Sequence, residues 1–478
     1  MKSKKVKKVP ITTKIRLGLL YTFPIALFFS YYPIIPIVST ASTNYEFSLP
    51  LIWLLLFSIL SLKDFALTLL PAFKAKRPIL LSLLFPVYIT LSAIWSPNHL
   101  RALLTAGIFW CLIITGVVIL TTFKDSPLFN KAKFLKIFMF SSVAFCAICW
   151  LQSILDILSV GRETTLLCSG CTSLSFGFPH PSGFAIEPQF MGNLLLAPTL
   201  TALYLWTKKD SGNSVFSKKS LSLFSFLFLS TLFLTFSRGA IYSFCVGFAL
   251  LLILSIFKLK NRAFLKTIPL ALASAVFVIL AQGVFSAVSY TNSTFLSGVE
   301  KSISQMTLGK VNLKLEPEKP VTSNQTKPED TSDSPVFDGY VEESTNVRMN
   351  FNRIAIDLAF KTPKTAIFGY GLGSAGTAMY TEGKTSAPLE IIQNEPLSLL
   401  LETGLLGVLL ALLSLMLVLN FIRKLNRPER YLLWAIVLSF ALSLMFFSGL
   451  PNALHVYLCP VFLVISLPEA FPENRRLS

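Results

Sequence analysis

The 478-residue sequence contains few charged residues and very few histidines. Asp, Glu, Lys and Arg make up 14% of the chain, hydrophobic residues make up 53%, and there are three histidines. The mean hydropathy is +0.65. This composition excludes a soluble globular protein, because too few polar side chains are present to cover its surface. No phosphate-binding glycine loop, haem site or His-rich metal cluster is recognisable, and the histidines are scattered at His99, His180 and His455.

The cysteines are few and give no sign of a metal site. Five of the seven lie within apolar stretches, where we expect them to pack as small apolar residues. Cys168 and Cys171 lie in a predicted outer loop and can form a small disulfide there. A zinc site would need two more ligands, and none follows nearby in the sequence. We therefore expect no bound metal.

Apolar stretches close to the length of about 20 residues that crosses a bilayer recur along the whole chain. We predict an all-α integral membrane protein with about twelve transmembrane helices. The second stretch can extend through the apolar residues that follow Asp64, and the last is short and contains Pro460. The predicted spans cover residues 17–37, 48–62, 79–95, 102–122, 135–156, 188–206, 221–236, 240–257, 265–288, 397–420, 431–448 and 453–467.

Basic residues predict the orientation of these spans. With both termini in the cytoplasm, alternate connections place 29 of the 42 lysines and arginines on the inner side. We therefore predict a multi-pass protein of the cytoplasmic membrane whose basic loops face anionic lipid rather than nucleic acid. Without a small-residue cleavage site after it, the first apolar stretch is interpreted as an anchor.

The predicted topology divides the chain into three parts. Residues 1–288 form transmembrane helices one to nine, residues 289–396 form a large loop on the outer side, and residues 397–478 form the last three helices and a short tail. Within the loop, residues 314–346 are rich in Pro, Ser, Thr and acidic residues. With little to bury, we predict a flexible insert there.

The pattern becomes helical from Arg348 onward and predicts a helix lying on the outer surface. Arg348 and Arg353 are placed away from its apolar face. We expect that face to consist of Met349, Ile354, Ile356, Leu358, Ala359 and Phe360.

Arginines gather on the predicted outer side, close to the ends of helices. The planar guanidinium can bind two phosphate oxygens at once, and it stays charged at every relevant pH. Arg238 lies in a very short predicted turn at the edge of the bilayer, where it needs either a structural ion-pair partner or an anionic ligand. This arrangement points to the phosphate or diphosphate of a lipid, and the outer arginines are Arg101, Arg162, Arg238, Arg348 and Arg353.

Polar side chains accompany these arginines at two helix starts. His180 and Glu187 precede Pro188, and an acidic residue before a first-turn proline is a favourable helix start. Gln393, Asn394 and Glu395 open the tenth predicted span, which also contains Glu402.

A set of short motifs resembles the bacterial O-antigen ligase and O-antigen polymerase family. The motifs are Ser237-Arg238-Gly239-Ala240, the segment PKTAIFGYGLG at 363–373, and QNEPLSLLLETGLLG at 393–407. The stretch Leu91–Ser96, followed by Arg101, is also similar. The resemblance covers roughly residues 80–410, and it also extends to the layout of about twelve spans with a large outer loop before the last helices.

The resemblance implies an inverting, metal-independent glycosyltransferase of the GT-C type that works without a cofactor. Such enzymes take a glycan from a polyprenyl diphosphate and transfer it to a glycan or lipid acceptor at the outer face of the cytoplasmic membrane. The absence of an acidic pair from the first outer loop agrees with a metal-independent reaction. By motif position, Arg101, Arg238, Arg348 and Arg353 would bind the leaving diphosphate. Gln393 and Asn394 are further candidates for binding the substrate.

The sequence departs from the family pattern at the residue expected to act as base. Ligases of the family usually have a His-Asn pair where this chain has Gln393-Asn394, and glutamine takes up no proton at neutral pH. The departure favours a polymerase or a divergent member over a ligase. The candidate bases are then Glu395, Glu187, His180 and Glu402.

Two other functions remain open from the sequence. A transporter or flippase of lipid-linked glycans would need cationic residues along a path through the spans, whereas here the charges gather at one face. A divergent family member that only binds a glycan lipid is the third interpretation.

Overall fold

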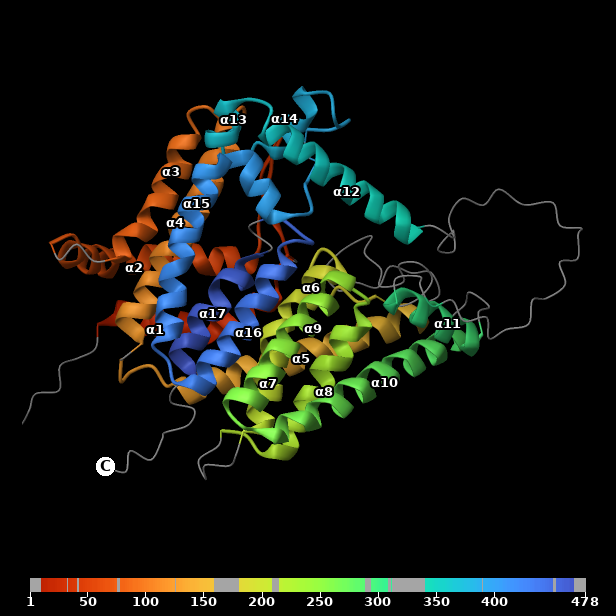
Figure 1. Ribbon diagram of the computed structural model, residues 1–478. Coiled ribbons are helices and arrows are strands. Elements are labelled where there is room, and N and C mark those ends of the chain that lie inside the picture. Colours follow the sequence, from red (N-terminus) through yellow and green to blue (C-terminus); the bar gives the residue numbers. More distant parts are fainter. Residues whose placement is uncertain are drawn as a thin grey trace, which may run out of the picture.

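The structure is a computed structural model of the chain. It describes residues 10–31, 33–40, 43–74, 78–124, 126–158, 180–208, 215–288, 294–307, 311, 340–388, 390–449 and 453–467. Within this part the chain is helical apart from one antiparallel hairpin of two strands, β1 (Ile35–Thr40) and β2 (Thr43–Phe47). The predicted helical fold class is confirmed (Figure 1). The hairpin includes the stretch predicted to connect the first two spans and begins within the predicted first span.

The helices vary from six to 29 residues in length. In chain order they are α1 (Ile11–Phe28), α2 (Leu49–Lys74), α3 (Leu84–Ser92), α4 (His99–Val118), α5 (Lys131–Leu158), α6 (Pro188–Leu194), α7 (Leu196–Thr207), α8 (Lys218–Leu234), α9 (Arg238–Ile253), α10 (Thr267–Val288), α11 (Phe295–Met306), α12 (Tyr340–Ala359), α13 (Pro363–Phe368), α14 (Ala375–Thr381), α15 (Glu395–Arg423), α16 (Arg427–Ser443) and α17 (Leu454–Ser466).

Seven helices of the described part are long and apolar enough to cross a bilayer, judged by length and composition. The protein is therefore a multi-pass membrane protein. The candidate spans are Ile11–Phe28, Leu49–Ala72, His99–Phe123, Lys131–Leu155, Arg238–Lys258, Arg262–Val288 and Glu395–Arg423.

The other five predicted spans contain shorter helices. The stretch 79–95 contains α3, which has nine residues, and the stretch 188–206 is divided at Leu195 into α6 and α7. The helices α8 and α16 have 17 residues each, and α17 has 13. An α-helix rises 1.5 Å per residue, so these helices are shorter than the hydrocarbon core unless flanking segments complete the crossing. The number of spans stays a prediction.

The first two helices differ from their predicted bounds. The first was predicted to run to residue 37, but α1 ends at Phe28, and Pro33 and Pro36 follow it outside the helix. Proline lacks the N–H that a helix needs and favours extended backbone, as in β1. In contrast, α2 continues through the residues after Asp64 and ends at Lys74, as the apolar pattern allowed.

The helices α1 and α2 bring together two charges that the sequence pattern placed in separate segments on the inner side. Arg16 lies in α1 and is buried, and its guanidinium donates a hydrogen bond to the Asp64 carboxylate in α2. The guanidinium also lies 5.7 Å from the centre of the Phe123 ring. A buried cation needs such partners, so the pair fixes how α1 and α2 meet.

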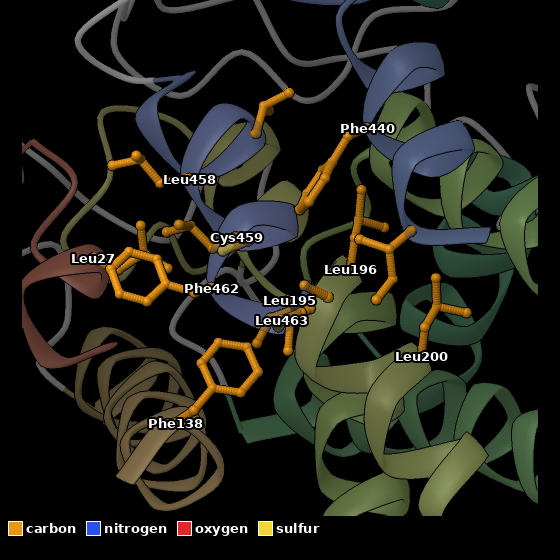
Figure 2. Packing of buried hydrophobic residues seen from close by; sticks show 14 of the residues in the cluster. Leu27, Phe138, Leu195, Leu196, Leu200, Phe440, Leu458, Cys459, Phe462 and Leu463 are labelled. Atoms are coloured by element: carbon orange, nitrogen blue, oxygen red, sulfur yellow. The ribbon is translucent and has the colours of Figure 1, made fainter. Parts of the chain in front are cut away.

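The core is centred on α17. Nearly every residue of this helix is buried, which is typical of a helix surrounded by other helices. Figure 2 shows Phe462 and Leu463 of α17 between Leu27, Phe138 and the leucines of α7. The Phe462 ring stacks on Phe23 with centroids 4.0 Å apart. The last predicted span is therefore a central packing element despite its short length.

Small residues bring α9 and α16 close together. A Cβ added at Gly247 would lie 1.8 Å from Ser439 Oγ and 2.8 Å from the carbonyl oxygen of Ala435. Helices in membranes associate tightly where such residues let the backbones approach. This contact positions the N-terminus of α9, which carries Arg238, relative to the end of α16.

Candidate functional site

The turn between α8 and α9 positions Arg238. Leu234 ends α8 and Arg238 begins α9, so only three residues connect the two helices. The Ser237 hydroxyl accepts a hydrogen bond from the backbone N–H of Ala240 at 3.4 Å and thereby caps α9. The very short turn predicted from the sequence is confirmed, and the Arg238 side chain is half-buried.

Residues 444–449, which follow α16, connect the starts of three helices. We call them the 444–449 segment. The Gln189 side chain in α6 donates to the Phe446 carbonyl at 2.7 Å, and Gly239 in α9 packs directly on Phe446. The backbone N–H of Glu395 in α15 donates to the Leu444 carbonyl at 2.8 Å. The motifs around Glu187, Arg238 and Glu395 are thus carried to one segment by elements far apart in the sequence.

Glu395 is held at this segment by its side chain as well. Its Oε2 accepts a hydrogen bond from the backbone N–H of Gly449 at 3.0 Å. One carboxylate oxygen is therefore oriented by the backbone, and the second remains for another contact. Glu187, by comparison, immediately precedes α6, where Pro188 is the first helical residue as predicted, and its side chain is exposed.

Gln393 and Asn394 differ in the use of their side chains. Asn394 Oδ1 accepts a hydrogen bond from the Leu397 N–H at 3.2 Å, so this buried residue caps α15. Gln393 Oε1 is shielded from solvent and has no hydrogen-bond partner among the described residues. A buried amide oxygen without a partner is costly, which makes Gln393 the better candidate for contact with a ligand.

His180 is packed against the Arg238 turn. Its ring stacks on Phe236, two residues before Arg238, with centroids 5.3 Å apart. Burial lowers the pKa of the His180 imidazole to about 3, because the charged form loses its hydration. The ring is therefore neutral at pH 7 and a weak proton acceptor. This environment favours a packing role for His180 over the role of base.

The helix α15 is broken at Gly404, which the apolar pattern did not predict. Gly404 has φ 65° and ψ −174°, and the parts before and after it run in different directions in Figure 1. We call residues 395–403 the first part of α15. A break leaves the carbonyl groups at its end without helical partners, so other groups must supply donors.

The glycine loop, residues 369–373, supplies these donors. The Tyr370 N–H donates to the Leu401 carbonyl at 3.0 Å, and the Gly371 N–H donates to the Glu402 carbonyl at 2.7 Å. Gly369, Gly371 and Gly373 all have positive φ, and a Cβ at Gly371 would lie 2.5 Å from Ser96 Cα. The Gly-Tyr-Gly-Leu-Gly motif is thus a loop that closes against the broken helix.

Glu402 holds the same loop through its side chain. Its carboxylate accepts hydrogen bonds from the Gly373 N–H at 2.8 Å and from the Ala375 N–H at 3.1 Å. Arg101 lies beside Gly373 and interacts electrostatically with Glu402. Both carboxylate oxygens are therefore in use, which favours an orienting role for Glu402 over that of a base.

Sequence reasoning missed how residues of α3 and of the turn after it lock this arrangement. The Tyr88 hydroxyl shares its one hydrogen between the Thr403 carbonyl oxygen at 2.7 Å and the Phe368 carbonyl oxygen at 3.1 Å. Ser92 Oγ accepts from the Leu372 N–H at 3.2 Å, and Ser96 Oγ donates to the Leu372 carbonyl at 3.1 Å. The Leu91–Ser96 stretch was a recognisable signal for the two serines, whereas Tyr88 lies before it.

The two arginines of α12 point in different directions. They are five residues apart, which is about 140° around a helix. Arg353 is exposed, while Arg348 is half-buried and follows the line of the buried Ala355 and Leu358. The predicted apolar face is wrong in part, since Met349, Ile356 and Phe360 are exposed, and the packed face consists of Phe351, Ile354, Ala355, Leu358 and Ala359.

This packed face connects α12 to the first part of α15. Ala355 and Leu358 share a buried cluster with Ile392 and Leu401. Arg348 is therefore carried by the same unit as Gln393–Glu395. The helix also begins at Tyr340, so residues 340–346 of the predicted insert are helical; residues 314–339 lie outside the described part.

The described residues contain no group of three or more His, Cys, Asp or Glu side chains able to hold a metal ion. Arg162 and the Cys168/Cys171 pair lie outside the described residues.

The comparison with curated proteins finds no match for this chain. The comparison with protein-family models finds one over residues 223–412. The matched part extends from α8 through the Arg238 turn, α12, the glycine loop and the first part of α15. It thus contains most of the candidate site, and the family is the one that the motifs resemble. The model is that of O-antigen ligase, and residues 223–412 of this membrane protein form an O-antigen ligase family domain.

Proposed function

We propose that the protein is a glycosyltransferase that ligates or polymerises a glycan carried on a polyprenyl diphosphate, at the outer face of the cytoplasmic membrane. An O-antigen ligase family domain implies ligation or polymerisation of lipid-linked glycans in surface-polysaccharide assembly. The observation that carries the proposal is the extent of this domain, which includes both Arg238 and Gln393–Glu395.

The geometry at the 444–449 segment supports binding of an anion. Arg238 is the first residue of α9, and Glu395 is the first residue of α15. The N-terminus of a helix carries a partial positive charge, so two such ends reinforce the guanidinium. Arg238 binds the donor diphosphate in this proposal, with Arg348 closing over it from α12. Arg101 contributes to the positive potential through its place at the glycine loop, and the exposed Arg353 contributes least.

The arginines that bind the diphosphate would also lower the activation barrier of the transfer. As the acceptor oxygen bonds to the sugar's anomeric carbon, the bond from that carbon to the diphosphate oxygen breaks. Negative charge then grows on the leaving diphosphate, where fixed guanidinium groups stabilise it. The acceptor hydroxyl gives up its proton in the same process.

Glu395 is the base that we propose for this proton. Its Oε2 is oriented by the Gly449 N–H, whereas Glu402 uses both oxygens on backbone groups and His180 is a weak proton acceptor. Glu187, with an exposed side chain near Gln189, is the second candidate. Gln393, whose Oε1 lacks a partner, would contact the sugar or the acceptor.

The decisive experiment replaces Arg238 in purified full-length protein and measures transfer from a polyprenyl-diphosphate glycan. We expect Arg238→Ala and Arg238→Lys both to reduce transfer by at least about 100-fold, because lysine keeps the charge but not the planar fork. Arg262→Ala is the matched control, since Arg262 is exposed and precedes α10.

Melting curves of each variant separate loss of function from loss of folding. Wild-type transfer by a folded Arg238→Ala protein would return this arginine to a structural role. Failure of the wild-type protein to transfer any lipid-linked glycan, together with movement of the intact donor across vesicle membranes, would favour a transporter.

A further inference from the structure

A group of basic residues lies at the opposite end of α15 from Glu395. It consists of Lys124, Arg423, Lys424 and Arg430. We call it the Phe421 patch because the ammonium groups of Lys124 and Lys424 both lie over that ring. Two candidate spans end here, His99–Phe123 and Glu395–Arg423. The patch therefore lies where helices leave the bilayer, whichever side of the membrane this is.

Two ammonium groups from distant parts of the chain share the Phe421 ring. Lys124 Nζ lies 5.7 Å from the ring centre and Lys424 Nζ lies 5.8 Å from it. The two ammonium groups therefore lie no further apart than about twice the distance from either one to the ring centre. Phe421 is half-buried and packs on the core, so the ring is fixed while the lysine ends remain in reach of water.

Arg423 and Arg430 add positive charge next to these lysines. The Arg430 guanidinium donates to the Arg423 carbonyl at 3.3 Å, which satisfies one of the carbonyl groups at the end of α15. The C-terminus of a helix carries about half a negative charge, which offsets only a small part of the patch. The Arg423 and Lys424 side chains are exposed.

The carboxylates that form ion pairs among the described residues have partners outside the Phe421 patch. Glu429 accepts from Lys208 at 3.1 Å, Asp64 pairs with Arg16, and Glu382 pairs with Lys361. In the sequence around the Phe421 patch, basic residues outnumber acidic residues even when Asp125 is counted. Like charges held this close repel one another, so an anion from outside the chain would stabilise them.

We propose that Lys124, Arg423 and Lys424 bind the phosphate of an anionic phospholipid. A phospholipid places its phosphate at the level where a span ends, and its acyl chains can lie along the apolar, exposed flank of α15, which includes Leu412, Leu415 and Met416. Clusters of basic residues next to a span recognise anionic headgroups in this way. The site is separate from the proposed glycosyltransferase site and does not depend on it.

Native mass spectrometry of the full-length protein in neutral detergent tests the proposal. We expect phosphatidylglycerol to be retained in preference to phosphatidylcholine. Each basic residue near an anionic headgroup contributes about fivefold to binding, so the double variant Lys124→Gln/Lys424→Gln should bind phosphatidylglycerol about 25-fold more weakly. The control is Lys258→Gln/Lys266→Gln, which removes two exposed lysines at the ends of other candidate spans and should change binding less than twofold.

Inorganic phosphate distinguishes a lipid from a free phosphate ligand. At equal concentration it should raise the melting temperature of the wild-type protein much less than phosphatidylglycerol does. Equal protection by both compounds would assign the patch to a soluble phosphate and overturn the lipid proposal. Equal loss of lipid from both double variants, or no preference for phosphatidylglycerol, would show that the patch is not a specific site.

Discussion

At the scale of single residues, the hydrogen-bond partners of each ionisable side chain distinguish the candidate bases. Glu402 uses its carboxylate on the N–H groups of Gly373 and Ala375, while Glu395 accepts one backbone N–H through Oε2. His180 is stacked and buried. The sequence identifies all three residues as ionisable candidates and does not distinguish them. A base, however, needs an accessible oxygen or nitrogen in hydrogen-bond reach of the acceptor.

The two glutamates are therefore expected to respond differently to the same substitution. Glu395→Gln keeps an oxygen for the Gly449 N–H and should fold normally, yet reduce turnover by about 10²–10⁴, the range for loss of a general base. Glu402→Gln replaces an acceptor by a donor opposite a backbone N–H and should cost about 1–3 kcal/mol of stability. Melting curves and turnover of both variants check this. The reverse pattern would exchange their roles.

His180 should make stability depend on pH. The folded protein keeps the imidazole neutral because its pKa is about 3, whereas the unfolded chain binds a proton below its ordinary pKa of about 6.5. Acid therefore favours unfolding between these values, by up to about 1.4 kcal/mol per pH unit. His180→Phe keeps the stack on Phe236 and should remove this contribution, measured as melting temperature at pH 7 and pH 5.

The same variant tests the role of His180 in catalysis. Turnover of a folded His180→Phe protein should stay within about tenfold of wild type, since only a ring is replaced by a ring. A loss of about 10²–10⁴ would instead mark His180 as the base. His180→Ala is the comparison that removes the ring and should weaken the Arg238 turn.

At the scale of elements, the break in α15 organises the end of the molecule that carries the candidate site. The first part of α15 begins at the 444–449 segment and ends at the glycine loop, and α12 packs on its side. Tyr88 connects its last carbonyl group, that of Thr403, to α3. One short helix thus fixes the positions of Glu395, Arg348 and Arg101 relative to one another, which an unbroken span would not do.

Gly404→Ala should damage this arrangement more than an ordinary glycine substitution. A Cβ there would lie 2.3 Å from the Ile367 carbonyl oxygen, and φ is 65°. Gly383 has nearly the same φ, 64°, but nothing within 4 Å of an added Cβ. Gly383→Ala therefore measures the backbone strain alone, about 1–2 kcal/mol. We expect a clearly larger drop in melting temperature for Gly404→Ala; equal drops would mean that the loop adapts to the added methyl.

At the scale of the whole molecule, charge and burial separate the two ends of the bundle. The predicted inner side carries most basic residues, including the Phe421 patch and the buried Arg16–Asp64 pair. The candidate site lies at the opposite end of α15, at the starts of α9 and α15. This separation is what the orientation rule for basic residues predicts for an enzyme that works on the outer side.

Cysteine labelling in intact cells tests the orientation. In a background with Cys168 and Cys171 replaced by serine, Ser332→Cys should react with a membrane-impermeant maleimide, and Ser214→Cys should react only after the membrane is opened. Reaction of Ser214→Cys in intact cells without reaction of Ser332→Cys would invert the topology and with it the proposed site of action.

The amino-acid sequence by itself determined those features that depend on neighbouring residues. The apolar stretches predicted a helical membrane protein, and helix starts such as Pro188 and the turn at Ser237 follow from local backbone chemistry. The motifs at 237–240 and 363–407 also pointed to the family before any geometry was known.

Only the tertiary structure decided which groups meet. The break at Gly404 is stable because the glycine loop and Tyr88, distant in the sequence, satisfy its carbonyl groups. The contact of Gln189, Gly239 and Glu395 with the 444–449 segment likewise joins three separate helices. Hydrogen bonds between distant segments leave no periodic signal in the sequence. The hydrogen-bond partners that distinguish Glu395 from Glu402 are therefore visible only in the tertiary structure.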